Sequence, residues 1–184
     1  MWRLLLALFL LGAPPAAADP AMWALLRDGG QIVLIRHAVT DPGVGDPPGF
    51  RLDDCRTQRN LSAAGVEEAK RLGAAFRAQR VPVAQVLSSP WCRCLDTARI
   101  AFGQARVDPM LGNLFTHGEN TVQQQAQFRA LARTPPAGGN LILVTHAATI
   151  ASFTGVSPGT GEAVIGAFDA TGRFRVAGRI VPPE

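Results

Sequence analysis

The chain has 184 residues, of which 47% are hydrophobic and 17% charged, a composition that suits one globular domain and excludes a disordered chain. The formal net charge of +4 comes almost wholly from arginine, since Lys70 is the only lysine. The arginines are scattered, without the basic runs or interleaved aromatic residues of a nucleic-acid-binding surface, so we expect no nucleic-acid partner.

The first 18 residues have the pattern of a secretory signal peptide. Residues 1–3 (MWR) are a basic start, Leu4 to Leu11 is a short apolar core, and residues 16–18 (AAA) supply an A-x-A cleavage site. A membrane anchor is the alternative, but the apolar stretch is well short of the roughly 20 residues that span a bilayer. We therefore expect cleavage near Ala18, a secreted or periplasmic protein that no longer contacts the membrane, and a single domain over residues 19–184.

Helical and strand patterns then alternate along the chain. In order, they predict a helix at Pro20–Arg27, a strand within Gln31–Thr40, a loop at Asp41–Asp54, a helix at Ala63–Gln79, a strand at Val83–Leu87, a helix at Trp91–Phe102, a strand at Ala105–Val107, a helix at Thr121–Arg133, a strand within Asn140–Ala147, and strands at Ala163–Phe168 and Phe174–Ile180. Ser62 is a good N-cap for the second helix, and Pro90 suits the N1 position of the third. The alternation predicts an α/β fold, a three-layer α/β/α sandwich whose sheet is mostly parallel, with a C-terminal antiparallel hairpin at its edge.

The loop at Asp41–Asp54 reads DPGVGDPPGFRLDD, which contains too much proline and glycine for regular structure. Long loops inside compact domains are usually functional, and this loop directly follows an Arg-His pair. We expect the loop, together with the segment around Phe115–Asn120, to shape a binding pocket.

Three cysteines, Cys55, Cys92 and Cys94, leave at least one thiol over if a bridge forms. Cys92 and Cys94 would diverge around a helix axis and should not pair with each other. A bridge from Cys55 to either is one possibility, and three small buried side chains are the other. The spacing does not match a zinc site, so we expect no metal.

Two apolar strands end on a histidine, and these two strand ends are the main functional signal. Arg36-His37 closes one strand, His146 closes another, and Arg93 falls in the first turn of a helix after a third. Parallel strands bring their carboxyl ends to one edge of a sheet, where ligands of α/β folds collect. Two guanidinium groups, a helix amino terminus and two imidazoles, with no neighbouring carboxylate, form a site for a phosphoryl group.

An imidazole among positive charges has a lowered pKa, and its neutral ring nitrogen is a competent nucleophile. The pattern therefore predicts attack of His37 on phosphorus, with charge stabilisation by Arg36, Arg93 and His146, and hydrolysis of the phosphohistidine by water. A carboxylic acid near the leaving oxygen would supply its proton.

Several separated motifs resemble the histidine phosphatase superfamily, also called phosphoglycerate-mutase-like. Its RHG signature resembles residues 36–38, its loop-to-helix entry residues 58–62 with Gly65, its S-S-P-x-x-R-x-x-x-T-A segment residues 88–98, and its second histidine strand residues 144–146. The resemblance runs from about Gln31 to Thr149 and fits an exported bacterial phosphatase. It implies that His37 is the phosphorylated nucleophile and that Arg36, Arg93 and His146 hold the phosphate, without a cofactor.

This chain departs from the family's motifs at two positions. Ala38 replaces the usual glycine, which narrows the backbone conformations available beside the nucleophile. Asn113 lies where the family commonly has its acid, and an amide cannot donate as an acid. Glu119 is our candidate for this role, with Asp108 and Glu162 behind it. Without an acid, the enzyme should prefer good leaving groups or phosphoramidates, whose nitrogen is readily protonated.

Two further residues have open roles. Thr40 either donates to phosphate or is an ordinary turn hydroxyl, and Arg59 either approaches the phosphate or pairs with Asp53 or Asp54. The predicted function is a metal-independent phosphomonoesterase acting on a small phosphorylated substrate. A non-catalytic phosphate-binding protein and, less favoured, a phosphoglycerate-type mutase are the alternatives. Neither the substrate nor the oligomeric state follows from the sequence.

Overall fold

The computed structural model describes residues 20–181, so the predicted signal peptide lies outside the described residues. The helices and strands, in chain order, are α1 (Pro20–Asp28), β1 (Ile32–Arg36), α2 (Ala63–Ala78), β2 (Val83–Ser88), α3 (Cys92–Phe102), β3 (Arg106–Val107), α4 (Thr121–Ala130), β4 (Asn140–Thr145), α5 (Ala147–Thr154), β5 (Ala163–Phe168) and β6 (Phe174–Ile180). Four short 3-10 helices occur between them, η1 (Cys55–Thr57), η2 (Pro109–Leu111), η3 (Gly118–Asn120) and η4 (Leu131–Arg133).

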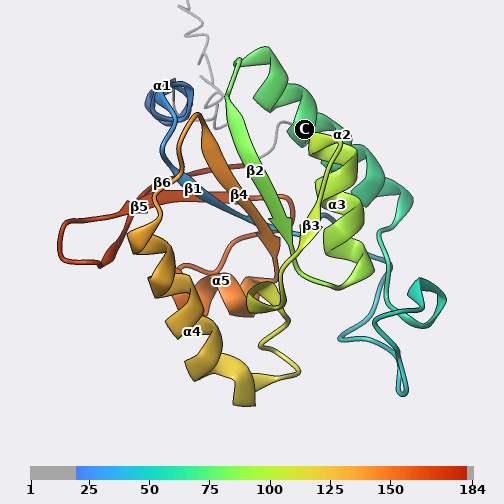
Figure 1. Ribbon diagram of the computed structural model, residues 1–184. Coiled ribbons are helices and arrows are strands. Elements are labelled where there is room, and N and C mark those ends of the chain that lie inside the picture. Colours follow the sequence, from blue (N-terminus) through green and yellow to red (C-terminus); the bar gives the residue numbers. More distant parts are fainter. Residues whose placement is uncertain (1–19, 182–184) are drawn as a thin grey trace, which may run out of the picture.

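The strands form one six-stranded sheet in the order β3-β2-β4-β1-β5-β6. Strands β3, β2, β4 and β1 pair in parallel, whereas β5 pairs antiparallel with both β1 and β6. The predicted mostly parallel sheet and its C-terminal antiparallel edge hairpin are confirmed. Helices cover both faces of this sheet, with α2 and α3 on one side and α4 and α5 on the other (Figure 1).

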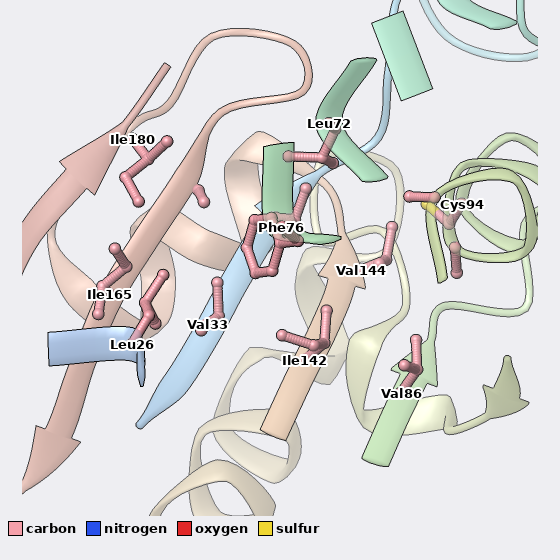
Figure 2. Close-up of a cluster of buried hydrophobic side chains, with 14 of the residues drawn as sticks. Leu26, Val33, Leu72, Phe76, Val86, Cys94, Ile142, Val144, Ile165 and Ile180 are labelled. Carbon is pink, nitrogen blue, oxygen red and sulfur yellow. The ribbon is translucent and has the colours of Figure 1, made fainter. Parts of the chain in front are cut away.

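Two hydrophobic clusters, one on each face, hold the three layers together. In β1, Val33 and Ile35 face the cluster under α1, α2 and α3, where Leu72 and Phe76 also lie (Figure 2). The alternate residues Ile32 and Leu34 belong to the opposite cluster, beneath α4 and α5. Successive side chains of a strand point to opposite faces, so a continuous apolar run is what a strand buried on both sides requires.

Two local features set the approach of the helices to the site. Ser62 caps α2 through its hydroxyl, which accepts from the Gly65 amide, as predicted. Gly65 itself allows α2 to lie against the chain just after β1, because a Cβ there would be 1.8 Å from the Val39 carbonyl oxygen. Helix α3 begins at Cys92 with Trp91 as N-cap, so Pro90 precedes the helix instead of occupying its first position.

Helix α5 is the element that the sequence patterns missed. It has eight residues, reads AATIASFT, and has His146 as an N-cap without a side-chain capping hydrogen bond. Neither a Ser, Thr, Asp or Asn N-cap nor a long amphipathic period marks such a helix. It ends in a left-handed conformation at Gly155.

A disulfide joins Cys55 to Cys92, which resolves the alternatives left by the sequence, and Cys94 is buried as a free thiol. The bridge ties η1, just beyond the loop at residues 41–54, to the first residue of α3. It closes a loop with a sequence separation of 37 residues. Closing a loop of this length restricts the unfolded chain.

We expect reduction of this bridge to lower the free energy of unfolding by about 3–4 kcal/mol, as loop-closure entropy predicts. Urea unfolding with and without dithiothreitol measures the change, and the Cys55→Ala/Cys92→Ala variant is the control, since the reductant should not affect it. Equal stability of the oxidised and reduced protein would contradict the expectation.

Candidate active site

A pocket of about 280 Å³ opens at the carboxyl edge of the parallel strands. The structure brings into its wall the four residues that the sequence singled out, from the ends of β1 and β4 and the first turn of α3. The lining residues are Arg36, His37, Gly43, Val44, Gly45, Arg59, Arg93, Asn113, Phe115, His146, Ala147 and Ala148. The loop after β1 and the segment near Phe115 both contribute, as expected.

A contact with the backbone determines which ring nitrogen of His37 carries the proton. Its Nδ1 lies 2.8 Å from the Ala38 carbonyl oxygen. A carbonyl oxygen only accepts, so Nδ1 carries the proton and donates it, which leaves the lone pair on Nε2. Burial, reinforced by the charges of Arg93 and Arg36, lowers the pKa of His37 to about 3, although the bond to Ala38 opposes the shift. The ring is therefore neutral at physiological pH and free to act as a nucleophile.

Alanine is accommodated at position 38 because the backbone there does not need glycine. Ala38 does not have a positive φ. Its side chain is buried and its amide donates to the Thr97 hydroxyl at 3.0 Å. The departure from the RHG signature therefore leaves the support of the His37 ring intact.

His146 lies opposite His37, with 5.4 Å between the ring centroids. Its Nε2 is 2.9 Å from the Ser89 hydroxyl, and the ring is almost fully buried. Burial, together with the nearby His37 and Arg93, holds the pKa of His146 well below its usual value. If the Ser89 hydroxyl donates to Nε2, the proton of the neutral ring is on Nδ1, where it can serve a ligand as a hydrogen-bond donor.

The helix amino terminus at the pocket is not the one that the sequence suggested. Ala147 and Ala148, in the first turn of α5, line the pocket. The first amide of α3, that of Cys92, instead donates to the Gln58 side chain at 2.9 Å. Amides and the helix dipole at such a terminus favour an anion.

Arg36 and Arg59 supply two of the three guanidinium groups in the wall. Arg36 donates through Nη1 to the Pro158 carbonyl, while its buried Nε has no partner in residues 20–181. Arg59 donates to the hydroxyl of Thr40 at 2.6 Å and to two loop carbonyls, those of Gly43 and Gly45. Thr40 thus orients Arg59 and is not itself among the lining residues.

The alternative pairing of Arg59 is not observed. Asp53 and Asp54 pair with Arg51 and Arg56 instead. Arg59 therefore remains a wall residue of the pocket.

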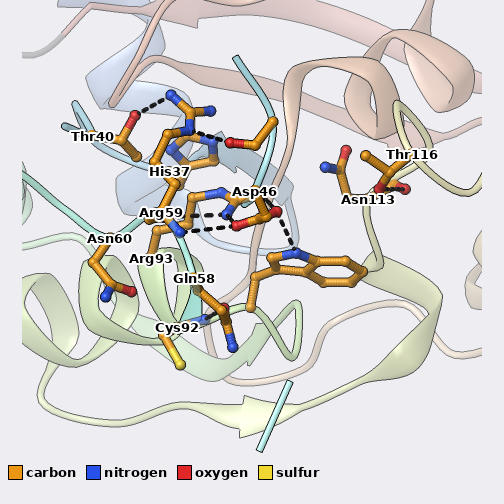
Figure 3. Close-up of polar contacts among 12 residues, drawn as sticks. His37, Thr40, Asp46, Gln58, Arg59, Asn60, Cys92, Arg93, Asn113 and Thr116 are labelled. Atoms are coloured by element: carbon orange, nitrogen blue, oxygen red, sulfur yellow. Dashed lines mark hydrogen bonds and ion pairs between the residues drawn. The ribbon is translucent and has the colours of Figure 1, made fainter. Parts of the chain in front are cut away.

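Arg93 is paired with a carboxylate, contrary to the expectation that the cationic cluster has none beside it. Asp46, from the loop after β1, binds Nη1 of Arg93 at 2.7 Å and Nη2 at 3.2 Å (Figure 3). The two side chains are 0% and 1% exposed. Sequence reasoning missed Asp46 because its partner is 47 positions away.

The predicted acids lie elsewhere. Glu119 is exposed on η3 and pairs with His117 at 3.1 Å, outside the pocket wall. Asp108 caps η2, and Glu162 binds Arg179 and the Gly159 amide. The position that the family's acid commonly takes is occupied by Asn113, which does line the pocket. Among the described wall residues none carries a carboxyl group, and the role of Glu119 stays a prediction.

Residues 20–181 contain neither a cluster placed to bind a metal ion nor a helix suited to span a membrane. No group of three or more His, Cys, Asp or Glu side chains within that range is placed to hold a metal ion. The helices over the same range include none that is both long and apolar enough to cross a membrane.

A mostly parallel sheet covered on both faces, with two imidazoles and three guanidinium groups at the carboxyl edge of its parallel strands, is the arrangement of an α/β phosphatase. Residues 32–113 match the histidine phosphatase superfamily (branch 1). The resemblance that the motifs predicted is confirmed over this segment.

Solved structures share the fold over most of the chain. The protein histidine phosphatase SixA in complex with tungstate is 17% identical, with a TM-score of 0.59, and the match covers 83% of this chain and 97% of that one. Mycobacterial glucosyl-3-phosphoglycerate phosphatase in complex with VO3 is 17% identical, with a TM-score of 0.62, covering 84% and 99%. Phosphoserine phosphatase from Entamoeba histolytica, with 3-phosphoglyceric acid, is 13% identical, with a TM-score of 0.59, covering 82% and 96%. No curated protein matches the sequence.

Proposed function

We propose that the protein is a metal-independent phosphomonoesterase that works through a phosphohistidine on His37. The observation that carries this proposal is the ring geometry of His37. Its Nδ1 proton is held by the Ala38 carbonyl, so the free Nε2 lone pair belongs to a residue in the wall of a pocket with three guanidinium groups. A neutral nucleophile beside a cluster of cations matches the needs of attack on a phosphate dianion.

In the first step, Nε2 of His37 forms a bond to phosphorus while the bond from phosphorus to the leaving oxygen breaks, and that oxygen takes the electron pair. Arg36, Arg59 and Arg93 neutralise the charge on the remaining phosphoryl oxygens. His146 and the first turn of α5 would donate further hydrogen bonds to them.

In the second step, water attacks phosphorus, the bond to Nε2 breaks, and inorganic phosphate leaves. The water gives up one proton to solvent, which balances the proton that the leaving oxygen takes up from solvent, and His37 returns to its neutral form with its Nδ1 proton still bound to the Ala38 carbonyl. The low pKa of His37 favours this form, because protonation of Nε2 would block the next attack.

The leaving group must depart without help from a carboxylic acid in the described pocket wall, where Asn113 replaces one. General acid catalysis typically contributes about 10²–10⁴-fold. We therefore propose that the substrate carries a leaving group of low pKa, or a phosphoramidate nitrogen that solvent protonates readily. Hydrolysis of phosphorylated histidine, the activity named for SixA, fits this requirement.

The activity is tested by hydrolysis of p-nitrophenyl phosphate and of a simple alkyl phosphate in the presence of EDTA. We expect the aryl ester to be hydrolysed with a kcat/KM at least about 10²-fold higher than the alkyl ester, with no effect of EDTA. Loss of activity in EDTA would contradict metal independence. A protein that binds inorganic phosphate but hydrolyses neither ester would be a phosphate-binding protein instead.

We further propose that the protein acts in a secreted or periplasmic location. The disulfide between Cys55 and Cys92 supports this, since structural disulfides persist in oxidising compartments. Sequencing the amino terminus of the protein from an expressing cell tests the accompanying expectation of cleavage near Ala18.

A further inference from the structure

Asp46 is an ionisable residue in contact with the site that the catalytic steps above leave unused. Both of its carboxylate oxygens are saturated with donors. One accepts from Nη1 of Arg93 and the Arg59 amide, and the other from Nη2 of Arg93 and the indole Nε1 of Trp91 at 3.0 Å. Burial opposes its ionisation, but these hydrogen bonds, above all those from Arg93, keep the pKa of Asp46 below its ordinary value.

These contacts exclude Asp46 as the missing acid. An acid must hold a proton and reach the leaving group, whereas Asp46 is ionised, has no exposed side-chain surface and is not among the residues of the pocket wall. Arg93 does belong to that wall. Asp46 therefore contacts a wall residue without itself lining the pocket.

The third guanidinium nitrogen of Arg93, Nε, indicates the role of the ion pair with Asp46. Nε of Arg93 is buried and has no hydrogen-bond partner among the described residues. A buried guanidinium nitrogen without a partner is costly, unless a ligand completes its hydrogen bonding. With both terminal nitrogens engaged by Asp46, the plane of the guanidinium is fixed, and Nε is left as a donor for a phosphoryl oxygen.

We propose that Asp46 is a positioning residue that fixes the guanidinium of Arg93 for the phosphoryl group. The inference rests on the phosphatase function proposed above. It also assigns a role to the loop at residues 41–54, which brings Asp46 to α3 from a distant part of the chain. Trp91, the N-cap of α3, donates a hydrogen bond to the same carboxylate and so helps to fix the position of Asp46.

The Asp46→Asn variant distinguishes an effect on the orientation of Arg93 from an effect on the charge near the pocket. Removing a negative charge alone would strengthen the binding of phosphate to a cationic pocket. Loss of the bidentate contact would weaken it, because Arg93 would be free to rotate. We expect the inhibition constant of inorganic phosphate to rise about 10-fold and kcat for p-nitrophenyl phosphate to fall about 10–100-fold. Tighter phosphate binding, or activity within about twofold of the wild type, would overturn the proposal.

Asp53→Asn is the matched control, since Asp53 is in the same loop, carries the same charge and is 86% exposed. A cycle with Arg93→Lys then tests whether Asp46 acts through Arg93. In that background, Asp46→Asn should change kcat by less than about threefold, because lysine has no fork to orient. Independent, multiplicative effects of the two substitutions would contradict the proposal.

If Asp46→Asn does not fold, Trp91→Phe serves in its place, because it removes one donor to Asp46 and keeps every charge. It should lower kcat by about 3–10-fold, and an unchanged kcat would count against the proposal. Phosphate binding by calorimetry separates this result from failure of the proposed function. If the wild-type protein binds phosphate but does not turn over substrate, the proposed function fails. The substitution at Asp46 or Trp91 should still lower the affinity for phosphate.

Discussion

Replacing His37 with alanine should lower kcat for p-nitrophenyl phosphate by at least about 10³-fold, because no other group can take the place of the attacking nitrogen. The buried, neutral ring of His37 is held by the Ala38 carbonyl, and its neighbour His146 has its Nε2 beside the Ser89 hydroxyl. The phosphate pocket itself retains its three guanidinium groups. Phosphate binding should therefore survive the substitution.

Alkaline quenching during turnover, which preserves the acid-labile bond between nitrogen and phosphorus, followed by mass spectrometry, checks the same prediction at the level of the intermediate. A phosphoryl group should be found on the peptide containing His37 in the wild type and be absent from the variant. His117→Ala is the control, since His117 is the one histidine of the chain besides His37 and His146 and lies outside the pocket wall. A phosphoryl group on another residue, or an active His37→Ala variant, would refute the mechanism.

Replacing Arg93 with methionine should lower kcat by about 10²–10³-fold, the usual loss for one donor to transition-state charge. Methionine keeps much of the apolar stem but leaves Asp46 as a buried, unpaired carboxylate. Removing one partner of a buried ion pair typically costs about 3–5 kcal/mol, so the variant should also be less stable. Kinetics and urea unfolding of one preparation measure both effects.

The double variant Asp46→Asn/Arg93→Met separates stability from catalysis. Because it leaves no unpaired charge, it should recover part of the lost stability while its activity stays low. Arg99→Met is the control, since Arg99 is exposed on the same helix. A double variant that regains activity together with stability would show that Arg93 acts only by maintaining the fold.

Local patterns in the chain were sufficient for most of the architecture. The apolar run before Arg36 and its counterpart before His146 predicted two strands buried on both faces, and both strands lie at the centre of the sheet. The second helix was predicted from its period and from Ser62, and its cap is observed. These features depend on neighbours within a few positions, which the sequence displays directly.

The helix after β4 was not predicted, because its eight residues are too few to show an amphipathic period. It forms because β4 delivers the chain to the sheet edge, where Ile150 packs into the cluster beneath α5. This packing also brings Ala147 and Ala148 to the pocket. Tertiary burial, and not local propensity, stabilises a helix of this length.

By itself, the sequence determined that two histidines and two arginines would meet at the carboxyl edge of a parallel sheet, since strand polarity alone places them there. Only the tertiary structure decided what surrounds them. The loop carboxylate of Asp46 reaches Arg93, Cys55 is joined to Cys92 and not to Cys94, and Glu119 is outside the pocket wall. The physical reason is that these contacts depend on the path of a proline- and glycine-rich loop, and no periodic pattern along the chain encodes that path.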